Sequence, residues 1–384
     1  MTERTERTEA ERTEAGRTEA GQTGQAETAK PELLSLFPEE LEELLAGWGE
    51  PRYRAGQLFS NLHRGLSPDE ITNIGKKLQE KLRQETVWSL PVAEVKLVSR
   101  IDGTVKYLFR LRDGNCVESV VMKYAHGNTV CISSQVGCRM GCRFCASTIG
   151  GKVRDLTPGE LLGQVLAAQR DMGERISNIV MMGIGEPLDN YDNVLKFLRL
   201  VNLPGGINIG YRHISLSTCG LVDRIRLLQK EDLPITLSVS LHAPDDETRS
   251  SIMPVNNRFG VDELLSACRE YFAATGRRIS FEYTLIAGKN DSPADATRLA
   301  RVLNSHLRGK NTTMPIHVNL IPVNPVKERG FTHSSGAAIR RFASVLESHG
   351  IRATVRRTLG ADINASCGQL RRGNLPKEDL EEGE

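Results

Sequence analysis

The chain has 384 residues, of which 39% are hydrophobic and 26% charged, a composition that can bury a substantial core in one large or two moderate domains. No stretch approaches the roughly 18–20 continuous apolar residues of a membrane span, and the N-terminus lacks the apolar core of a secretory signal, so we expect a cytoplasmic protein that does not associate with membranes. The formal net charge of +2 does not by itself indicate a nucleic-acid partner.

The first 130 residues divide into three segments that differ in composition and in the spacing of their apolar residues. Residues 1–30 repeat Thr, Glu, Arg, Ala and Gly with almost no large apolar side chain, which predicts a disordered, low-complexity extension. Residues 31–92 carry apolar side chains at helical spacing and predict a small helical N-terminal domain. Residues 93–130 alternate polar with β-branched or aromatic side chains around Asp-Gly turns, which predicts a strand-rich connector.

The segment from residue 131 to 358 alternates strand-like with helix-like runs. Buried strands such as "ISNIVMMGIG" and "PITLSVSLHAP" are separated by helical runs such as "YDNVLKFLRLVN", giving about six β/α units. This order predicts an α/β fold, here a (β/α)6 partial barrel of the TIM type, whose active site forms at the C-terminal ends of the strands. Residues 359–384 follow as a C-terminal segment with a flexible acidic tail.

Three of the eight cysteines form a compact motif directly after the first predicted barrel strand. Cys138, Cys142 and Cys145 have the spacing C-x3-C-x2-C, and such clustering in a long chain indicates metal binding or catalysis rather than a disulfide framework. A structural zinc site closes at four ligands, so it would need a distant fourth one such as Cys131 or a histidine. A [4Fe-4S] cluster on three thiolates instead leaves one iron open to a small molecule.

A C-x3-C-x2-C motif after the first strand of a (β/α) barrel resembles the hallmark of radical S-adenosylmethionine (SAM) enzymes. The resemblance implies a [4Fe-4S] cluster on the three cysteines, whose open iron binds the amino and carboxylate groups of SAM. Electron transfer from the cluster then yields a 5′-deoxyadenosyl radical. The same resemblance implies that SAM is held by residues at the strand ends, namely Gly185, Glu186, Ser217, Ser240, Leu241, His242 and Asn324.

Two further cysteines indicate which of the radical SAM families this chain resembles. Cys131 lies seven residues before Cys138, and Cys367 lies in "NASCGQLRRG" after the last predicted strand; each alone could be a small buried hydrophobe. Together with the cluster motif, the chain resembles the RlmN/Cfr family of RNA methyltransferases, most closely its RlmN members. The resemblance covers nearly all of the chain and is carried by "VESV" (117–120), "CISSQVGCRMGCRFCAS", "MGIGEPL", "LSTCG", "SLHAP", "NLIPVNP" and "SCGQL".

The family resemblance implies a mechanism that uses two SAM molecules per turnover. The first would methylate Cys367, and the radical from the second would abstract a hydrogen from that S-methyl group. The carbon radical would add to adenine C2, which is electron-poor and no nucleophile. Glu118 matches the family's proton acceptor, although Cys131 is an alternative base. Attack by Cys131 would then release the product and leave a transient Cys131–Cys367 disulfide, which an external reductant resets.

The resemblance also implies partners. The expected substrates are adenosine 2503 of 23S ribosomal RNA (rRNA), in a protein-poor assembly intermediate, and adenosine 37 of transfer RNAs (tRNAs). An external electron donor such as flavodoxin and a monomeric enzyme are expected as well. The helical domain at residues 31–92 would have an accessory role in RNA binding. Basic residues would contact RNA phosphates, namely those of "ATVRRT" and "GQLRRG" near the C-terminus and, around the cysteines, Arg139, Arg143, Lys152 and Arg154.

Three alternatives stay open at this point. The first is a Cfr-type enzyme that methylates C8 of the same rRNA adenosine with the same residues. The second is another radical enzyme, for example one that activates a protein, which has no use for Cys367. The third is a non-catalytic Fe-S or zinc RNA-binding module, which needs neither Cys131 nor Cys367.

Overall fold

The structure is a computed structural model that describes residues 30–88, 90–309, 312–324, 326 and 329–365. The predicted disordered extension and Cys367 lie outside these residues. From Pro31 onward the chain forms one compact unit. The predicted helical segment contains α1 (Pro38–Ala46), α2 (Tyr53–Leu62) and α3 (Lys76–Glu85), together with the short 3-10 turns η1 (Leu33–Ser35) and η2 (Pro68–Glu70).

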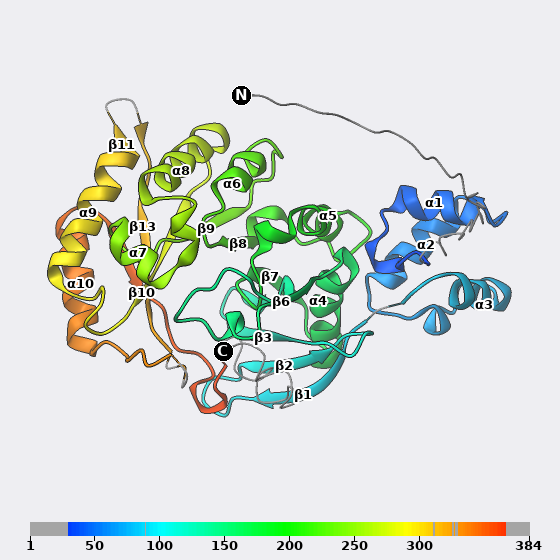
Figure 1. The fold of residues 1–384 in the computed structure, drawn as a ribbon. Coiled ribbons are helices and arrows are strands. Elements are labelled where there is room, and N and C mark those ends of the chain that lie inside the picture. Colours follow the sequence, from blue (N-terminus) through cyan, green and yellow to red (C-terminus); the bar gives the residue numbers. More distant parts are fainter. Residues whose placement is uncertain (1–29, 89, 310–311, 325, 327–328, 366–384) are drawn as a thin grey trace, which may run out of the picture. The chain divides into compact units, whose positions relative to one another are not determined.

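One ten-stranded sheet organises the rest, in the order β1-β2-β3-β4-β7-β8-β9-β10-β13-β14 (Figure 1). Its first part is antiparallel and consists of β1 (Val92–Val98), β2 (Val105–Arg110), β3 (Cys116–Tyr124) and β4 (Gly127–Cys131). From β4 onward all neighbours are parallel, and the further strands are β7 (Ile176–Met181), β8 (Ile214–Thr218), β9 (Thr236–Ser240), β10 (Ile279–Leu285), β13 (His317–Pro322) and β14 (Arg352–Val355).

Helices connect the parallel strands and cover one side of the curved sheet (Figure 1). In chain order they are α4 (Pro158–Met172), α5 (Tyr191–Asn202), α6 (Val222–Leu228), α7 (Asp246–Ile252), α8 (Val261–Thr275), α9 (Pro293–Leu307) and α10 (Gly336–Ser348). Parallel neighbours require such crossover connections. The edges of the described sheet are β1 and β14, so the barrel is partial, and the predicted α/β fold class is confirmed.

A small two-stranded sheet isolates the cysteine motif. Strands β5 (Gln135–Gly137) and β6 (Lys152–Asp155) pair antiparallel and close the base of the loop between them. Gly137 has a φ of 78°, and a Cβ there would lie 2.0 Å from the carbonyl oxygen of Gly151. Only glycine fits this junction. The other short elements are β11 (Arg308–Gly309), β12 (Thr312–Thr313), η3 (Ala146–Thr148), η4 (Pro187–Asn190), η5 (Tyr211–His213), η6 (Pro254–Asn257) and η7 (Ala361–Ile363).

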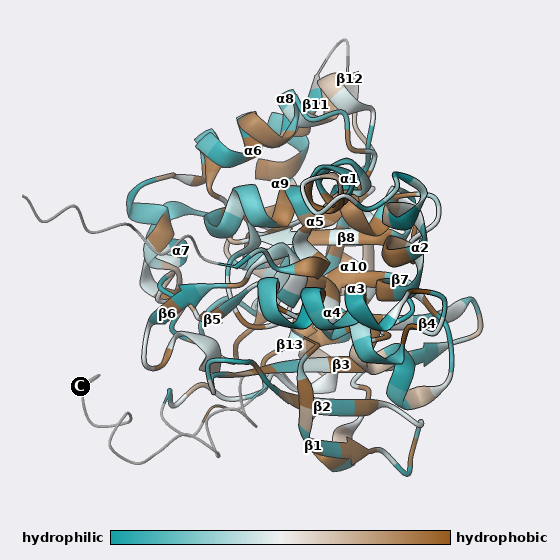
Figure 2. Cartoon of the chain, turned by 90° about the vertical axis from the view of Figure 1, so that its right-hand side faces the viewer, coloured by the Kyte–Doolittle hydropathy of each residue, from teal (hydrophilic) through white to brown (hydrophobic). Residues whose placement is uncertain are grey.

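The core lies between the sheet and its helices. All seven residues of β10 are buried, as expected for a parallel strand covered on both faces. Hydrophobic residues gather on central strands such as β7 and β8, whereas the outer helix α3 carries long hydrophilic stretches (Figure 2). A capping box fixes the start of α4, since the Thr157 hydroxyl accepts from the Glu160 N–H and the Glu160 side chain caps back.

The helical segment packs directly on the barrel. The backbone N–H of Gly159 at the start of α4 donates to the Ser35 hydroxyl at 2.8 Å, and Lys196 of α5 pairs with Glu40 of α1 at 2.8 Å. The predicted divisions near residues 92, 130 and 358 therefore fall inside one compact unit, and they stay predictions. None of the helices among the described residues combines the length and hydrophobicity that a bilayer crossing demands.

Candidate active site

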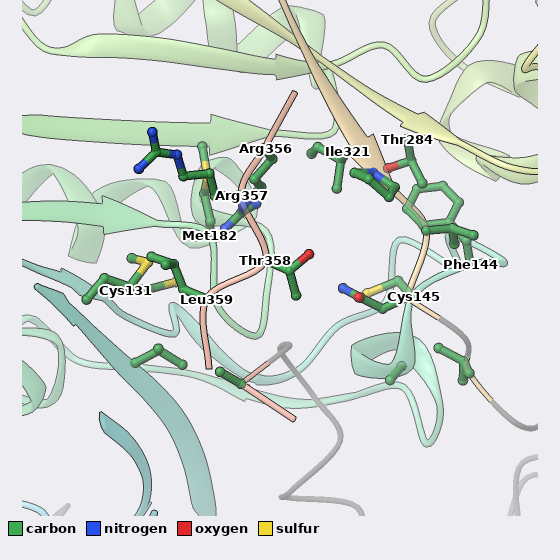
Figure 3. A pocket seen from close by; sticks show the side chains of 18 of the residues that line it. Cys131, Phe144, Cys145, Met182, Thr284, Ile321, Arg356, Arg357, Thr358 and Leu359 are labelled. Carbon is green, nitrogen blue, oxygen red and sulfur yellow. The ribbon is translucent and has the colours of Figure 1, made fainter. Parts of the chain in front are cut away.

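A cavity of about 460 Å³ lies at the C-terminal ends of the parallel strands. Cys131 at the end of β4 and Cys145 from the cysteine motif both line it, together with residues that follow β13 and β14. In Figure 3 the segment Arg356–Leu359 crosses the cavity between these two cysteines. The strand-end position is the one predicted for a barrel active site.

Backbone hydrogen bonds fix the loop that carries the three-cysteine motif. The N–H of Cys138 donates to the carbonyl of Gly151 at 2.9 Å, and the N–H of Arg143 donates to the carbonyl of Ile252 at 2.9 Å. Cys138 and Cys142 are buried, whereas Cys145 is partly exposed. The loop is thus tied both to its own base and to the end of α7, and it turns Cys145 towards the cavity.

The environment of these thiols disfavours free thiolates. Burial raises the pKa of Cys138 to about 12, and the charge of Glu186 and the neighbouring Cys145 act in the same direction. Burial also raises the pKa of Cys142, with further contributions from Cys145 and Cys138. Three adjacent thiolates in such a site need nearby positive charge, which metal ions supply.

The three thiols of the motif are a donor set that fits an iron–sulfur cluster. Within the ranges that the structure describes, no group of three or more His, Cys, Asp or Glu side chains is placed to hold a single metal ion. In a [4Fe-4S] cluster each cysteine binds its own iron, and the thiols need not converge. The buried hydroxyls of Ser134 and Ser147 lack partners among the described residues and can receive a further polar ligand.

Gly185 and Glu186 follow β7 in a closely packed turn. Gly185 has a φ of 108°, and a Cβ there would come within 2.7 Å of the backbone nitrogen of Gln135. Glu186 is buried and its carboxylate accepts from the backbone N–H groups of Cys219 (2.7 Å) and Leu188 (3.1 Å). Burial raises the pKa of Glu186. The carboxylate therefore links the ends of β7 and β8. The ammonium group of a bound ligand could donate only to the oxygen lone pairs that these two hydrogen bonds leave unused.

His242 occupies a constrained position after β9. Its φ is 58°, in the left-handed region, and its Nδ1 accepts from the backbone N–H of Thr284 at 2.9 Å. Burial lowers the pKa of His242 to about 3, so the ring is neutral and its Nε2 carries the proton. The ring meets Phe144 of the cysteine loop edge-on, with centroids 4.9 Å apart. His242 thus connects the barrel sheet with the cysteine loop.

The remaining predicted SAM-binding residues occupy strand ends. Asn324 lines the cavity directly after β13. Ser217 and Ser240 are half-buried in β8 and β9, and Leu241 is fully buried with its N–H donating to the carbonyl of Glu282 at 3.1 Å. The structure therefore brings Cys131, Cys145 and Asn324 to one cavity and places the other predicted residues at neighbouring strand ends.

Glu118 lies on β3, on the same face of the sheet as Cys131. Val120 pairs with Cys131 across β3 and β4, and Glu118 stands two residues before Val120, so the alternation of a strand puts all three on one face. Glu118 is 2% exposed and forms an ion pair with Lys106 at 3.1 Å. Sequence reasoning missed Lys106, because only the pairing of β2 with β3 brings it to Glu118.

The C-terminal segment is attached to the turn between β1 and β2. The N–H of Gly360 donates to the Asp102 carboxylate at 2.8 Å. The Asp362 carboxylate accepts from the Ser99 hydroxyl at 2.7 Å and from the N–H of Arg100 at 2.8 Å. Ala365, two residues before Cys367, lines the cavity. These anchors were also missed, since no local pattern distinguishes them from ordinary turn residues.

Comparisons with known proteins agree with this geometry. The Radical SAM superfamily model matches residues 132–300, and the model of the ribosomal RNA large subunit methyltransferase N-terminal domain matches residues 31–87. A probable dual-specificity RNA methyltransferase RlmN from Alkaliphilus oremlandii is 52% identical over 90% of this chain and 99% of the relative. One from Pelotomaculum thermopropionicum is 54% identical over 86% of this chain and 89% of the relative.

A solved structure supports the same assignment. The crystal structure of a radical SAM methyltransferase from Sphaerobacter thermophilus has a TM-score of 0.83 and 44% sequence identity, and it covers 88% of this chain and 98% of that one. Both the barrel and the helical segment at residues 31–87 thus have counterparts in one family. The chain belongs to the RlmN family of radical SAM methyltransferases.

Proposed function

We propose that this chain is a monomeric cytoplasmic enzyme that methylates C2 of adenosine 2503 in 23S rRNA and C2 of adenosine 37 in tRNAs. The names of its relatives, which are RNA methyltransferases, support an RNA substrate. One observation carries the mechanism: Cys131, which is not part of the cluster motif, lines the same cavity as Cys145 and as the segment that leads to Cys367. A cluster and two separate thiols are the parts that methyl transfer to an unreactive carbon requires.

Each group of residues has its own task in this proposal. Once bound, the [4Fe-4S] cluster on Cys138, Cys142 and Cys145 and two SAM molecules per turnover supply the methyl group and the 5′-deoxyadenosyl radical. Cys367 carries the methyl group to the base. The residues proposed to bind SAM at the strand ends are Gly185, Glu186, Ser217, Ser240, Leu241, His242 and Asn324.

The last steps use groups of this chain and the base, and they release one electron. Once the Cys367 sulfur is joined through a methylene to C2, Glu118 takes the C2 proton, with Cys131 as the alternative base, and the unpaired electron of the adduct leaves to the oxidised form of the one-electron carrier that serves the enzyme. The Cys131 thiolate then attacks the Cys367 sulfur. An S–S bond forms as the S–CH2 bond breaks, and the carbon takes up a proton to become the methyl group. A cytoplasmic thiol reductant resets the disulfide, and an electron donor of the flavodoxin class serves the cluster.

The test is anaerobic reconstitution with iron and sulfide, followed by SAM, a reductant and protein-free rRNA or tRNA. We expect 5′-deoxyadenosine and an adenosine whose new methyl group maps to C2 by mass spectrometry. Cys367→Ala should form no methylated base, and Cys131→Ala should accumulate a covalent protein–RNA adduct. Cys116→Ala is the matched control, because this thiol lies at the start of β3 outside the cavity, and it should behave as wild type.

Other results would select the alternatives. Methylation at C8 would indicate a Cfr-type reaction on the same site. Formation of 5′-deoxyadenosine without any methylated adenine would contradict the proposal and point to another radical reaction. Full cellular function of Cys367→Ala would favour a non-catalytic RNA-binding role.

A further inference from the structure

A buried ion pair lies beside the cavity. Lys106 Nζ of β2 lies 3.1 Å from Glu118 Oε2 of β3, and both side chains are 1% exposed. Leu108 faces Glu118 and Val120 faces Lys106 across the two strands, so the charged residues are diagonal neighbours on one face of the sheet. Because a buried pair must overcome the desolvation of both ions, its presence calls for a role beyond stability.

The same ammonium group makes a second contact with a distant part of the chain. Lys106 Nζ donates to the backbone carbonyl of Asn364 at 2.9 Å. Asn364 has a φ of 46°, in the left-handed region, and ends the short turn η7. One cation therefore joins the Glu118 carboxylate to a carbonyl that lies three residues before Cys367.

This bridge stands at the edge of the catalytic cavity. Val120 and Cys131 line the cavity from the face that also carries Lys106 and Glu118. On the other side of the bridge, Ala365 lines the same cavity. The anchors at Asp102 and Asp362 hold the segment further out at the β1–β2 turn, whereas the buried ammonium of Lys106 holds it at Asn364, three residues before Cys367.

We propose that Lys106 is a positioning residue, which docks residues 360–365 onto Glu118 and thereby directs Cys367 towards Cys131 and the proton acceptor. The inference rests on the function proposed above for Cys367. An uncharged side chain of similar length would remove the ion pair of the Glu118 carboxylate with Lys106 and the ammonium donor to the Asn364 carbonyl. The segment would then lose its inner attachment, while the cysteine loop on the opposite wall would stay as it is.

The experiment compares Lys106→Met with wild type as the full-length, anaerobically reconstituted chain. For Lys106→Met we expect about ten-fold faster hydrogen–deuterium exchange at residues 360–365, and about ten-fold less methyladenosine per 5′-deoxyadenosine, as for loss of a charge-assisted hydrogen bond. Iron content should equal that of wild type. Lys106→Arg, which keeps the charge, should recover most of the wild-type ratio of methyladenosine to 5′-deoxyadenosine.

Lys123→Met is the matched control. Lys123 lies on β3 and forms an ion pair with Glu174 at 2.7 Å, but its side chain is 41% exposed, and this ion pair does not involve residues 360–365. This variant should match wild type in both measurements. If the loss of any lysine in this sheet had a purely structural effect, exchange and the product ratio would change in both variants. Such an effect could also lower iron content and methylation together.

Unchanged exchange and an unchanged product ratio in Lys106→Met would overturn the inference. Should this variant fail to fold because Glu118 loses its ion pair with Lys106, the double variant Lys106→Met/Glu118→Gln removes both charges. It should still show fast exchange at residues 360–365, and slow exchange there would equally overturn the inference. If the wild-type chain forms no methyladenosine, the proposed function is contradicted but the docking role of Lys106 is not, because the exchange measurement does not depend on turnover.

Discussion

The two walls of the cavity are held in different ways. The wall that carries the cysteine motif is fixed by main-chain hydrogen bonds, through the β5–β6 pairing and the bonds of Cys138 to Gly151 and Arg143 to Ile252. On the C-terminal wall, the N–H of Arg356 makes a last strand-like bond to the carbonyl of Leu320 at 2.8 Å. Beyond that point the segment depends on side chains of β2 and of the turn between β1 and β2, and on its own Asp362 carboxylate.

This difference has a functional reason under the proposed mechanism. A cluster must stay in one place, and main-chain bonds provide a scaffold that single side-chain changes hardly affect. A methyl carrier must instead meet SAM, the adenine and Cys131 in turn, so a few side-chain contacts suit it better. Substitutions on the wall that carries the cysteine motif should therefore abolish both radical formation and methyl transfer. Substitutions on the C-terminal wall should reduce methyl transfer and leave radical formation unchanged.

The largest effect is expected for Cys142→Ala on the cluster wall. Cys142 is buried, and its loss leaves two ligands for the cluster. Iron and sulfide content per chain should fall strongly, and both 5′-deoxyadenosine and methyladenosine should become undetectable. A variant that keeps wild-type iron content and turnover would show that this wall does not hold the cluster.

A smaller and more selective effect is expected for Asp362→Asn on the C-terminal wall. The amide is a poorer acceptor for the Ser99 hydroxyl and the Arg100 N–H, so methylation should fall several-fold while 5′-deoxyadenosine and iron content stay constant. Asp192→Asn, an exposed carboxylate on α5, serves as the control. An equal loss of 5′-deoxyadenosine would contradict the separation of the walls.

The same anchor predicts a pH dependence. The hydrogen bond from Ser99, followed by that from the Arg100 N–H, lowers the pKa of Asp362 below its ordinary value of 3.8. A lowered carboxylate pKa means that the stabilising contact is complete above 3.8 and is lost as the pH falls through the folded-state value. After correction for the chemical exchange rate, protection of residues 360–365 should thus be constant from neutral pH down to about pH 5. A decrease in protection already between pH 7 and pH 6 would contradict this assignment.

The cluster wall was predictable from sequence because its signals are local. The cysteine spacing and the alternation of strands and helices are read within short windows, and they predicted the parallel strands and the loop at their C-terminal ends. The strands at 93–130 were predicted as a connector, yet β3 pairs with β4 and extends the barrel sheet. Pairing between strands is a non-local property, and periodicity within one strand does not reveal its neighbour.

For the same reason the partners of these charges within the chain could not be predicted from sequence. Arg139, Lys152 and Arg154, which are predicted to contact RNA phosphates, each form an ion pair with a carboxylate of the chain, and the RNA contacts stay a prediction. Lys152 bridges Asp189 at 3.0 Å, and Arg154 binds Glu160 at 2.7 Å. Their observed contacts stabilise the surroundings of the cysteine loop, while the role of Lys106 emerged only from the register of β2 and β3.

The smallest effect is expected outside both walls, for Arg170→Met at the contact between α4 and the helical segment. Arg170 pairs with Glu70 and donates to the carbonyl of Gly65 at 2.7 Å, but its side chain is 46% exposed. Exposed ion pairs contribute about 1 kcal/mol or less and weaken with salt, so thermal unfolding should shift only slightly, and less so at high ionic strength. Iron content and the ratio of methyladenosine to 5′-deoxyadenosine should match wild type. If that ratio fell instead, the helical segment would have to act on the methyl-transfer step itself. Methyl transfer would then depend on residues outside the two walls of the cavity.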